Sequence, residues 1–411
     1  MEISNMGSTG TPRKALVVGL GIAGMASAKR LTEVGWDVTV IERSAERRTG
    51  GYFIALFGSG KASAERTGIL DRLPTRAGPE AKTWQVARNG QRTPGMGFAD
   101  IPDAPRVLLR GDIEEALYAV LPDTVEVRYG TVPTVITQDP DGVDVTLRST
   151  ADGTDTRERF DLVIGADGVR STVRRLVFGP DANFVDQTGF MIAATLLDRP
   201  VTGYETNEGA VLAEPGRSAW VFPFDNRPPS ILFTYRTDDI DSEFTRPAID
   251  SIRAAYGPET PGPLLSELFD RFETAEDYLF DSAQQVRMRQ WHHGRVALIG
   301  DAAWCMTLYS GLGASSGIAG GELLGTMLER HDHDIQAALA AWNARLHPYV
   351  DYQHRRIDTN RQIFVPADKR EHLRRTSMMR LGRSRVLQPV LGRLQAGSED
   401  FRMKAMDIAA P

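Results

Sequence analysis

Three glycines and one acid near the start of the sequence have the types and spacing of a nucleotide-binding turn. Gly19, Gly21 and Gly24 follow a short apolar run, and Glu42 comes about twenty residues later. In such a turn the first glycine allows a tight bend, the second lets a phosphate approach the backbone, and the third lets the helix pack closely on the strand. Because the N–H groups at a helix start favour an anion, the pattern indicates a pyrophosphate site.

The acid indicates which nucleotide the turn holds. A carboxylate at Glu42 accepts hydrogen bonds from ribose hydroxyls and repels a 2′-phosphate, so it suits the adenosine of FAD or NAD and disfavours NADP. The stretch from Lys14 to Arg43 contains strand, glycine turn, helix, second strand and acid in the required order. This complete order favours a functional site over a chance glycine triplet.

Two later strands also end in an aspartate beside a glycine. Asp167 and Gly168 follow one apolar strand, and Asp301 follows another. An aspartate there is costly to bury alone, so we expect Asp167 to meet a partner or a turn N–H. Asp301 precedes the glycine-rich stretch Ser310–Gly317, which opens a long helix. That helix start, with Asp301 beside it, could hold a polyol chain and an electron-rich ring.

Arginines stand at two places where a pyrophosphate could lie. Arg110 ends a predicted strand, and a guanidinium can bind a pyrophosphate through two parallel hydrogen bonds, although an ordinary salt bridge is the alternative. Arg43 and Arg48 lie in the polar turn after Glu42, which could instead be a solvated loop. Gly51, the second of two adjacent glycines, would let the backbone approach a flat ring.

One strand alternates aromatic side chains, and one turn contains two histidines. Trp220, Phe222 and Phe224 fall on one strand face, so they could line a pocket for a flat apolar substrate or belong to the core. His292 and His293 are adjacent, and neighbours in a strand point to opposite faces. We therefore expect a solvated turn there and no shared metal.

Composition limits the classes of protein. The 411 residues are 41% hydrophobic with a formal net charge of −6, which is typical of a globular protein of two or three domains and argues against nucleic-acid binding. The single cysteine, Cys305, excludes an intramolecular disulfide and favours a reducing, cytoplasmic setting. We find neither a signal peptide pattern in the first dozen residues nor an apolar run long enough to span a membrane.

The elements that must position these residues divide the chain into interleaved parts. We predict a discontinuous nucleotide-binding α/β domain from residues 1–75, 105–182 and 281–333. A β-rich substrate domain would comprise 76–104 and 183–280, with strands Phe190–Leu196, Ala210–Ala213, Ala219–Phe224 and Ile231–Tyr235 and a helix Ala248–Tyr256. Residues 334–411 would form a long helix, Asp334 to about Ile363, ended by Pro366, and a helical tail.

The tail from Lys369 to Arg402 is basic and amphipathic. Its apolar residues recur between arginines, so we expect it to pack back on the first domain with the arginines in water. A membrane surface or a partner protein is the alternative for such a segment. The apolar residues concerned are Leu373, Met378, Met379, Leu381, Leu387, Val390 and Leu391.

Three fingerprints in order resemble the FAD-dependent (class A) flavoprotein monooxygenases related to p-hydroxybenzoate hydroxylase. They are the glycine turn with its acid at 19–42, DLVIGADGVRSTVR at 161–174 and VALIGDAA at 296–303. Within this family, the organisation of the chain is similar to that of the tetracycline-oxidising and polyketide-tailoring members. The resemblance implies a Rossmann-like FAD-binding domain of the glutathione reductase type, a mixed β-sheet substrate domain and a long C-terminal helix. It also implies FAD as cofactor and NAD(P)H as a transient co-substrate.

The resemblance also implies roles for single residues. Glu42 and Arg110 would hold ribose and pyrophosphate, Asp301 the ribityl chain, and residues 311–315 would face the isoalloxazine ring. Many relatives have histidine and proline where this chain has Trp304 and Leu308, which we count with the aromatic strand as substrate-pocket candidates. The candidate cofactor-binding residues are Gly19, Gly21, Ala23, Gly24, Glu42, Arg43, Arg48, Gly51, Arg110, Asp167, Gly168, Asp301, Gly311, Gly313, Ala314 and Ser315.

The expected activity is that of an FAD-dependent monooxygenase. The resemblance implies hydroxylation or epoxidation of a polycyclic, aromatic or polyketide-type molecule with NAD(P)H and O2, through a flavin C4a-hydroperoxide, in secondary metabolism or antibiotic modification. Because the cofactor carries that chemistry, no acid–base residue is nominated. The alternatives are an FAD-bound cyclase or isomerase without redox turnover, and a non-catalytic flavin-binding interaction protein. A monomer or homodimer is expected.

Overall fold

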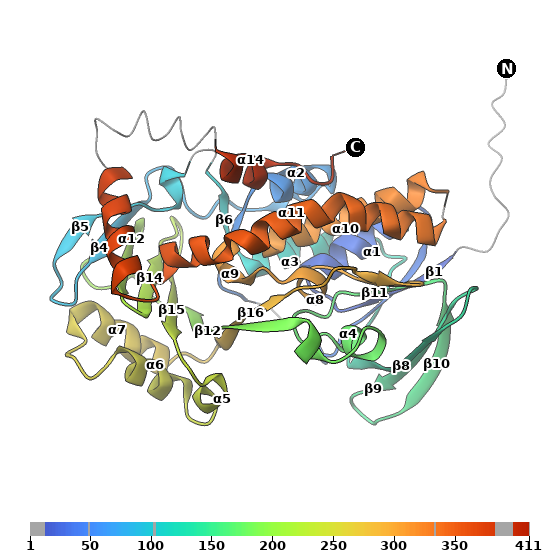
Figure 1. The fold of residues 1–411 in the computed structure, drawn as a ribbon, viewed down its shortest axis with the longest axis horizontal. Helices are drawn as coiled ribbons and strands as arrows, with labels where there is room; N and C mark the ends of the chain where they lie inside the picture. Colours follow the sequence, from blue (N-terminus) through green and yellow to red (C-terminus); the bar gives the residue numbers. More distant parts are fainter. Residues whose placement is uncertain (1–12, 48–49, 102–103, 333, 383–397, 411) are drawn as a thin grey trace, which may run out of the picture.

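The computed structural model describes residues 13–47, 50–101, 104–332, 334–382 and 398–410. Figure 1 shows two sheets side by side, with the long helix α11 (Ile335–Phe364) running across them and α10 (Gly313–Arg330) beside α1 on the side of the parallel sheet. The expected α/β class with mixed sheets is confirmed. Arg48 lies outside the described residues.

The first sheet is mostly parallel and has the strand order β17-β18-β11-β1-β2-β7. All neighbouring pairs are parallel except β17 with β18. Ala15 to Val18 on the central strand are buried, as expected for a parallel strand covered on both faces. The strands are β1 (Lys14–Val18), β2 (Asp37–Ile41), β7 (Glu126–Arg128), β11 (Leu162–Gly165), β17 (His292–His293) and β18 (Val296–Leu298).

A three-stranded antiparallel sheet is attached to this domain, with the order β10-β9-β8. Its strands are β8 (Thr131–Gln138), β9 (Val143–Ser149) and β10 (Asp155–Phe160). The turn between β8 and β9 contains Asp139, whose carboxylate accepts hydrogen bonds from the N–H groups of Asp141 and Gly142. The turn pattern in the sequence therefore predicts this hairpin correctly.

The second large sheet has seven strands in the order β16-β12-β15-β14-β13-β4-β5. Neighbours are antiparallel except β13 with β4. The predicted helix is present as α6 (Ala248–Tyr256), whereas α5 (Ile240–Glu243) and α7 (Gly262–Glu273) were not predicted. The strands are β4 (Lys82–Val86), β5 (Arg92–Pro94), β12 (Val185–Leu196), β13 (Glu208–Glu214), β14 (Arg217–Phe222), β15 (Ser230–Arg236) and β16 (Tyr278–Val286).

One face of this sheet packs on α6 and α7, which lie below it in Figure 1. Phe233 of β15 contacts Tyr256, Phe269 and Phe272 of these helices, with ring centroids 5.6–5.8 Å apart. The other face is left for the cavity described below. Since β16 belongs to this sheet, residues 281–286 lie with the seven-stranded sheet and not with the parallel one.

Shorter elements join the two sheets. A two-stranded ribbon pairs β3 (Phe53–Leu56) with β6 (Arg106–Leu109). The remaining helices before α10 are α1 (Ile22–Glu33), α2 (Gly58–Arg66), α3 (Arg110–Ala119), α4 (Thr172–Val177), α8 (Asp301–Trp304) and α9 (Thr307–Ser310), with 3₁₀ turns at Leu70–Arg72, Phe98–Asp100 and Asp181–Asn183.

The predicted long helix is confirmed as α11. The Asp334 side chain accepts a hydrogen bond from the Ala337 N–H at its start, and the helix ends at Phe364, shortly before Pro366. Beyond it, α12 (Lys369–Gly382) packs against α11 and β13, so this part of the tail does not lie on the first domain. Leu387, Val390 and Leu391 lie outside the described residues.

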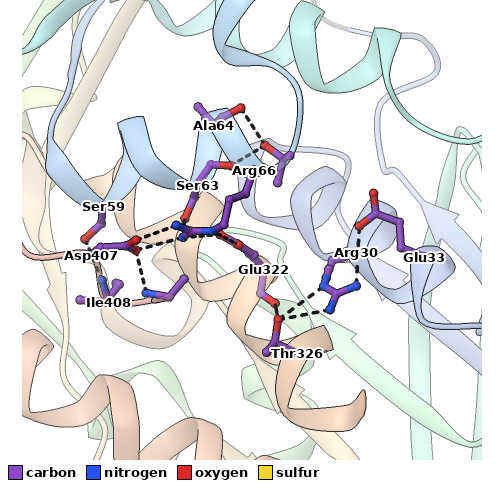
Figure 2. A network of polar contacts seen from close by, with 12 residues as sticks. Arg30, Glu33, Ser59, Ser63, Ala64, Arg66, Glu322, Thr326, Asp407 and Ile408 are labelled. Atoms are coloured by element: carbon purple, nitrogen blue, oxygen red, sulfur yellow. Dashed lines mark hydrogen bonds and ion pairs between the residues drawn. The ribbon is translucent and has the colours of Figure 1, made fainter. Parts of the chain in front are cut away.

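The end of the tail does pack on the first domain. Helix α14 (Glu399–Ala405) lies against α2, and Ala405 contacts Gly58 closely. Figure 2 shows how the last residues are held: Arg66 of α2 pairs with Asp407 at 2.6 Å and with Glu322 of α10. Ser59 hydrogen bonds to the Met406 carbonyl, and the Ile408 N–H donates to Ser59. We call Arg66, Glu322 and Asp407 the Arg66 clamp.

Within the described ranges, every helix is too short or too polar to span a lipid bilayer. The described residues also hold no group of three or more His, Cys, Asp and Glu side chains that could bind a metal ion.

Candidate functional site

A large cavity lies between the two sheets. Its volume is about 1150 Å³, which exceeds the roughly 300–1,000 Å³ of pockets that hold one small molecule. Its walls include the glycine turn at Gly21, Asp301 of α8, the sheet face at Trp220, and Phe401 of α14. The cavity therefore has room for a cofactor and a substrate together.

The glycine turn is built as the sequence predicted. Gly19 has φ +108°, and a Cβ atom there would lie 2.5 Å from the Ala166 carbonyl oxygen. A Cβ atom at Gly24 would overlap the Gly19 carbonyl oxygen, so the third glycine is needed for close helix–strand packing. No side chain in the described chain caps α1 at Gly21, and the N–H groups of its first turn remain available to an anion.

Glu42 lies beside this turn, at the end of β2. Its two carboxylate oxygens accept hydrogen bonds from the Leu20 N–H at 3.0 Å and the Ser44 N–H at 2.9 Å. Glu42 does not line the cavity itself, whereas Ala23 does. Arg43 next to it is exposed to solvent.

Arg110 lies close to the glycine turn. A Cβ atom at Gly21 would lie 3.9 Å from Arg110 Nη2, and both residues line the cavity, so the guanidinium and the start of α1 are neighbours there. Arg110 also pairs with Glu114 at 2.7 Å, and its backbone N–H donates to the Tyr52 carbonyl at 3.0 Å. Gly51 passes close to the start of α3, where a Cβ atom would lie 2.9 Å from the Gly111 nitrogen.

Asp167 has partners, as expected, but does not face the cavity. Its carboxylate accepts hydrogen bonds from the Ser171 hydroxyl at 2.5 Å, the Thr172 N–H at 2.6 Å and the Val173 N–H. Burial raises the pKa of this carboxyl, and these hydrogen bonds oppose the rise. Asp167 therefore orders the start of α4, while Gly168 beside it lines the cavity.

Asp301 at the start of α8 lines the cavity. Its side chain is open to the cavity but is otherwise enclosed by protein, so burial raises the pKa of its carboxyl while the Arg110 charge lowers it. Tyr52 lines the same region, and burial raises the pKa of its phenol. Cys305 is also here; burial raises the pKa of its thiol, whose sulfur donates to the Gln284 carbonyl at 3.3 Å.

The glycine-rich loop before α10 forms the next part of the wall. Gly311, Gly313 and Ala314 line the cavity, and Gly311 has φ +68° with Phe57 packed against it. Ser315 does not line the cavity, because it lies inside the first turn of α10, where its hydroxyl accepts a hydrogen bond from the Phe57 N–H at 3.1 Å. Ser315 therefore holds the glycine-rich loop from the side that faces away from the cavity.

Aromatic rings form another part of the wall, which we call the aromatic half of the cavity: Trp220, Phe222, Tyr309 and Phe364. Trp220 and Phe222 stack with centroids 5.7 Å apart, and Phe364 lies 5.0 Å from Trp220. Leu308 also lines the cavity.

Two predicted pocket residues lie elsewhere. Strand β14 ends at Phe222, so the alternation does not continue to Phe224, which is fully buried against Val107 and Leu109. Trp304 points from α8 into the core, away from the Asp301 side. Its ring lies 4.7 Å from Trp291 and 5.7 Å from Trp342, and its N–H donates to the Ser316 hydroxyl at 3.2 Å.

The structure also reveals cavity residues that the sequence did not indicate. Tyr52 follows the paired glycines directly, which was the one available signal. Asn360 lies near the end of α11. The sequence of this helix shows only an ordinary amphipathic pattern, which gives no sign of a cavity residue. Phe401 and Lys404 come from α14, which is too short to carry a periodicity signal. His292 and His293 were expected in a solvated turn, but they form the short strand β17, and neither lines the cavity.

Together these groups fit a flavin dinucleotide. Free helix N–H groups and a guanidinium suit a pyrophosphate, a carboxylate suits a polyol, and a glycine-rich wall admits a flat ring. All three belong to the lining of one cavity.

Comparison with known proteins agrees with this geometry. Residues 13–334 match the family described as FAD binding domain. Two Mycobacterium tuberculosis proteins described as uncharacterized are 31% identical over 82% of this chain and 91% of their own. The FAD-dependent monooxygenase asL4 of Sarocladium schorii is 29% identical over 77% of this chain and 76% of its own. The crystal structure of tetracycline destructase Tet(55) is similar with a TM-score of 0.75 and 25% identity, covering 95% of this chain and 97% of that one.

Proposed function

The chain belongs to the FAD binding domain family, and from this premise we propose that it is an FAD-dependent monooxygenase acting on a polycyclic, aromatic or polyketide-type molecule. NAD(P)H supplies the electrons and O2 the oxygen atom. The observation that carries the proposal is the single cavity, which joins the glycine turn and Asp301 to the aromatic half.

The proposed cofactor contacts begin beside the glycine turn and continue into the cavity. Glu42 binds the adenosine ribose beside the turn, and the start of α1 and Arg110 bind the pyrophosphate. Asp301 binds the ribityl hydroxyls, and Gly313 and Ala314 lie against the ring. When bound and reduced, the flavin activates O2 for transfer of one oxygen atom to the substrate.

The chain's own part in the reaction is to orient the substrate and to exclude water. Trp220, Phe222 and Phe364 offer flat apolar faces that suit a ring system. The similarity to tetracycline destructase Tet(55), an enzyme named for a polycyclic substrate, supports a substrate of this shape. Natural-product tailoring or antibiotic modification is the setting we propose.

The proposal is tested in two stages. Purified protein should be yellow and should release FAD, not FMN, because the glycine turn and Glu42 suit the adenosine diphosphate half of the dinucleotide, which FMN lacks. The oxidised protein is then mixed anaerobically with NADH or NADPH, and reduction of the flavin is followed by stopped-flow absorbance. O2 and a panel of polycyclic phenols are added next, and the product masses are measured by mass spectrometry. Flavin reduction and a product heavier by one oxygen atom are expected.

A different result would replace the proposal. A product of unchanged mass, formed without nicotinamide while the flavin stays oxidised, would identify a non-redox cyclase or isomerase. Release of FMN, or no flavin binding after reconstitution with FAD, would overturn the cofactor assignment.

A further inference from the structure

The polar atoms of the aromatic half are mostly used by the protein itself. The Tyr309 hydroxyl and the Thr234 hydroxyl hydrogen bond to each other at 2.7 Å. The Trp220 N–H donates to the Phe364 carbonyl at 3.0 Å, and the Ser230 hydroxyl donates to the Thr195 carbonyl at 3.2 Å. These groups are satisfied without a ligand and present their apolar parts to the cavity.

Asn360 differs from them. It lines the cavity from the last turn of α11, and its side chain is only 3% exposed. Within the described chain, its buried Nδ2 has no hydrogen-bond partner. A buried polar atom without a partner is uncommon, because it costs the desolvation of that atom with no hydrogen bond in return.

The position of Asn360 follows from that of Phe364, which lies one helical turn later on α11. Residues i and i+4 share a helix face, so Asn360 lies beside Phe364, whose ring is 5.0 Å from Trp220. The amide is therefore at the aromatic half and not at the glycine turn. Nδ2 itself has almost no accessible surface, and nothing in the described chain holds it, so a turn of the amide group would bring its donor to a ligand in the cavity without breaking a hydrogen bond of that nitrogen.

We propose that Asn360 is a specificity-determining residue that hydrogen bonds to a neutral oxygen, a ring carbonyl or a phenolic hydroxyl, of an otherwise apolar polycyclic substrate. This inference rests on the proposed function, since it names how that substrate is recognised. The rings stack on Trp220 and Phe364, and the oxygen is directed to the amide. A ring system without such an oxygen leaves Asn360 unpaired and is discriminated against.

The test is a binding measurement with two matched probes, 9-fluorenone and fluorene, which differ by one carbonyl oxygen. Binding to the oxidised, FAD-loaded protein is followed by flavin and tryptophan fluorescence, with no nicotinamide present. We expect Asn360→Leu to bind fluorenone about tenfold more weakly and to bind fluorene within about twofold of the original protein. Asn360→Gln should recover part of the fluorenone affinity.

A control variant is available on the same helix. Gln353 is fully buried two turns earlier, both of its amide atoms lack partners in the described chain, and it does not line the cavity. Gln353→Leu removes the same chemistry from the helix and should leave both affinities unchanged. Thermal unfolding of all variants with FAD bound separates loss of recognition from loss of folding.

Three outcomes would overturn the inference: unchanged fluorenone binding by Asn360→Leu, equal weakening of both probes, or an equal effect of Gln353→Leu. Binding of neither probe by the original protein would overturn the assignment of the aromatic half as a polycyclic site. Failure of turnover with nicotinamide and O2 would leave the binding result intact, so the two proposals fail separately.

Discussion

A serine at Gly21 should separate the stability of the fold from its affinity for the cofactor. Gly21 is the N-cap of α1 with φ −83° and ψ −175°, a conformation that any residue adopts. Serine is a better N-cap than glycine and reduces the freedom of the unfolded chain, so the free energy of unfolding of the apoprotein should stay equal or rise by a few tenths of a kcal/mol.

The same substitution fills the proposed pyrophosphate space. The new Cβ atom would lie 3.9 Å from Arg110 Nη2, leaving no room for a phosphate between α1 and the guanidinium. Loss of one charged hydrogen bond costs about 1.5–3 kcal/mol, so FAD should bind roughly ten- to a hundredfold more weakly. Gly24→Ala is the contrast, because its Cβ would overlap the Gly19 carbonyl oxygen and should destabilise the apoprotein by about 1–3 kcal/mol.

The assay combines urea unfolding of the apoprotein with titration of FAD by fluorescence quenching. If Gly21→Ser binds FAD as tightly as the original protein, the pyrophosphate does not lie between α1 and Arg110. If instead Gly21→Ser lowers apoprotein stability as much as Gly24→Ala, the second glycine serves the fold and not the cofactor.

Three further predictions follow from the contacts. Asp301→Ala and Arg110→Ala should each weaken FAD binding about ten- to a hundredfold in the same titration, while His292→Ala, remote from the cavity, should not; loss of binding in His292→Ala would contradict the site. Arg66→Gln should lower the free energy of urea unfolding by about 1–2 kcal/mol, because Glu322, whose side chain is only 9% exposed, loses its cation. Arg30 pairs with Glu329, whose side chain is 58% exposed, so Arg30→Gln should change that free energy by less than about 0.5 kcal/mol. Burial lowers the pKa of His354 below its ordinary value near 6.5, so just below pH 6.5 the unfolded chain takes up a proton that the folded chain does not. The free energy of unfolding should therefore fall as the pH drops below 6.5. His354→Gln should reduce the slope of unfolding free energy against pH in this range, and an unchanged slope would refute the role of His354.

The sequence predicted best where a local pattern and a local geometry coincide. The glycine turn, the hairpin at Asp139 and the helix α11 with its Asp334 cap each depend on residues close in sequence, and the structure confirms all three. The family match and the relatives confirm the resemblance to flavin-dependent monooxygenases.

The misplaced and missed residues depend on where an element ends or on contacts between distant elements. Phe224 is displaced because β14 ends two residues earlier than the alternation suggests, and Trp304 because a one-turn helix leaves its direction to the packing of α10 and α11. Asn360 and Phe401 reach the cavity only through the folding of the C-terminal helices over the sheets. No periodicity in the sequence encodes those contacts.

The tryptophan cluster makes the molecule its own optical probe. Trp291, Trp304 and Trp342 lie with ring centroids 4.7–5.8 Å apart and at fixed angles of 49–71°, so their ultraviolet transitions couple to one another. Such coupling should give an intense near-ultraviolet circular dichroism signal that disappears when the packing behind Asp301 loosens. Trp220 belongs to a different core cluster, in the aromatic half, so a ligand that stacks on it should change its share of the tryptophan fluorescence. Circular dichroism would thus follow the core behind Asp301, and fluorescence the aromatic half of the cavity, without an added label.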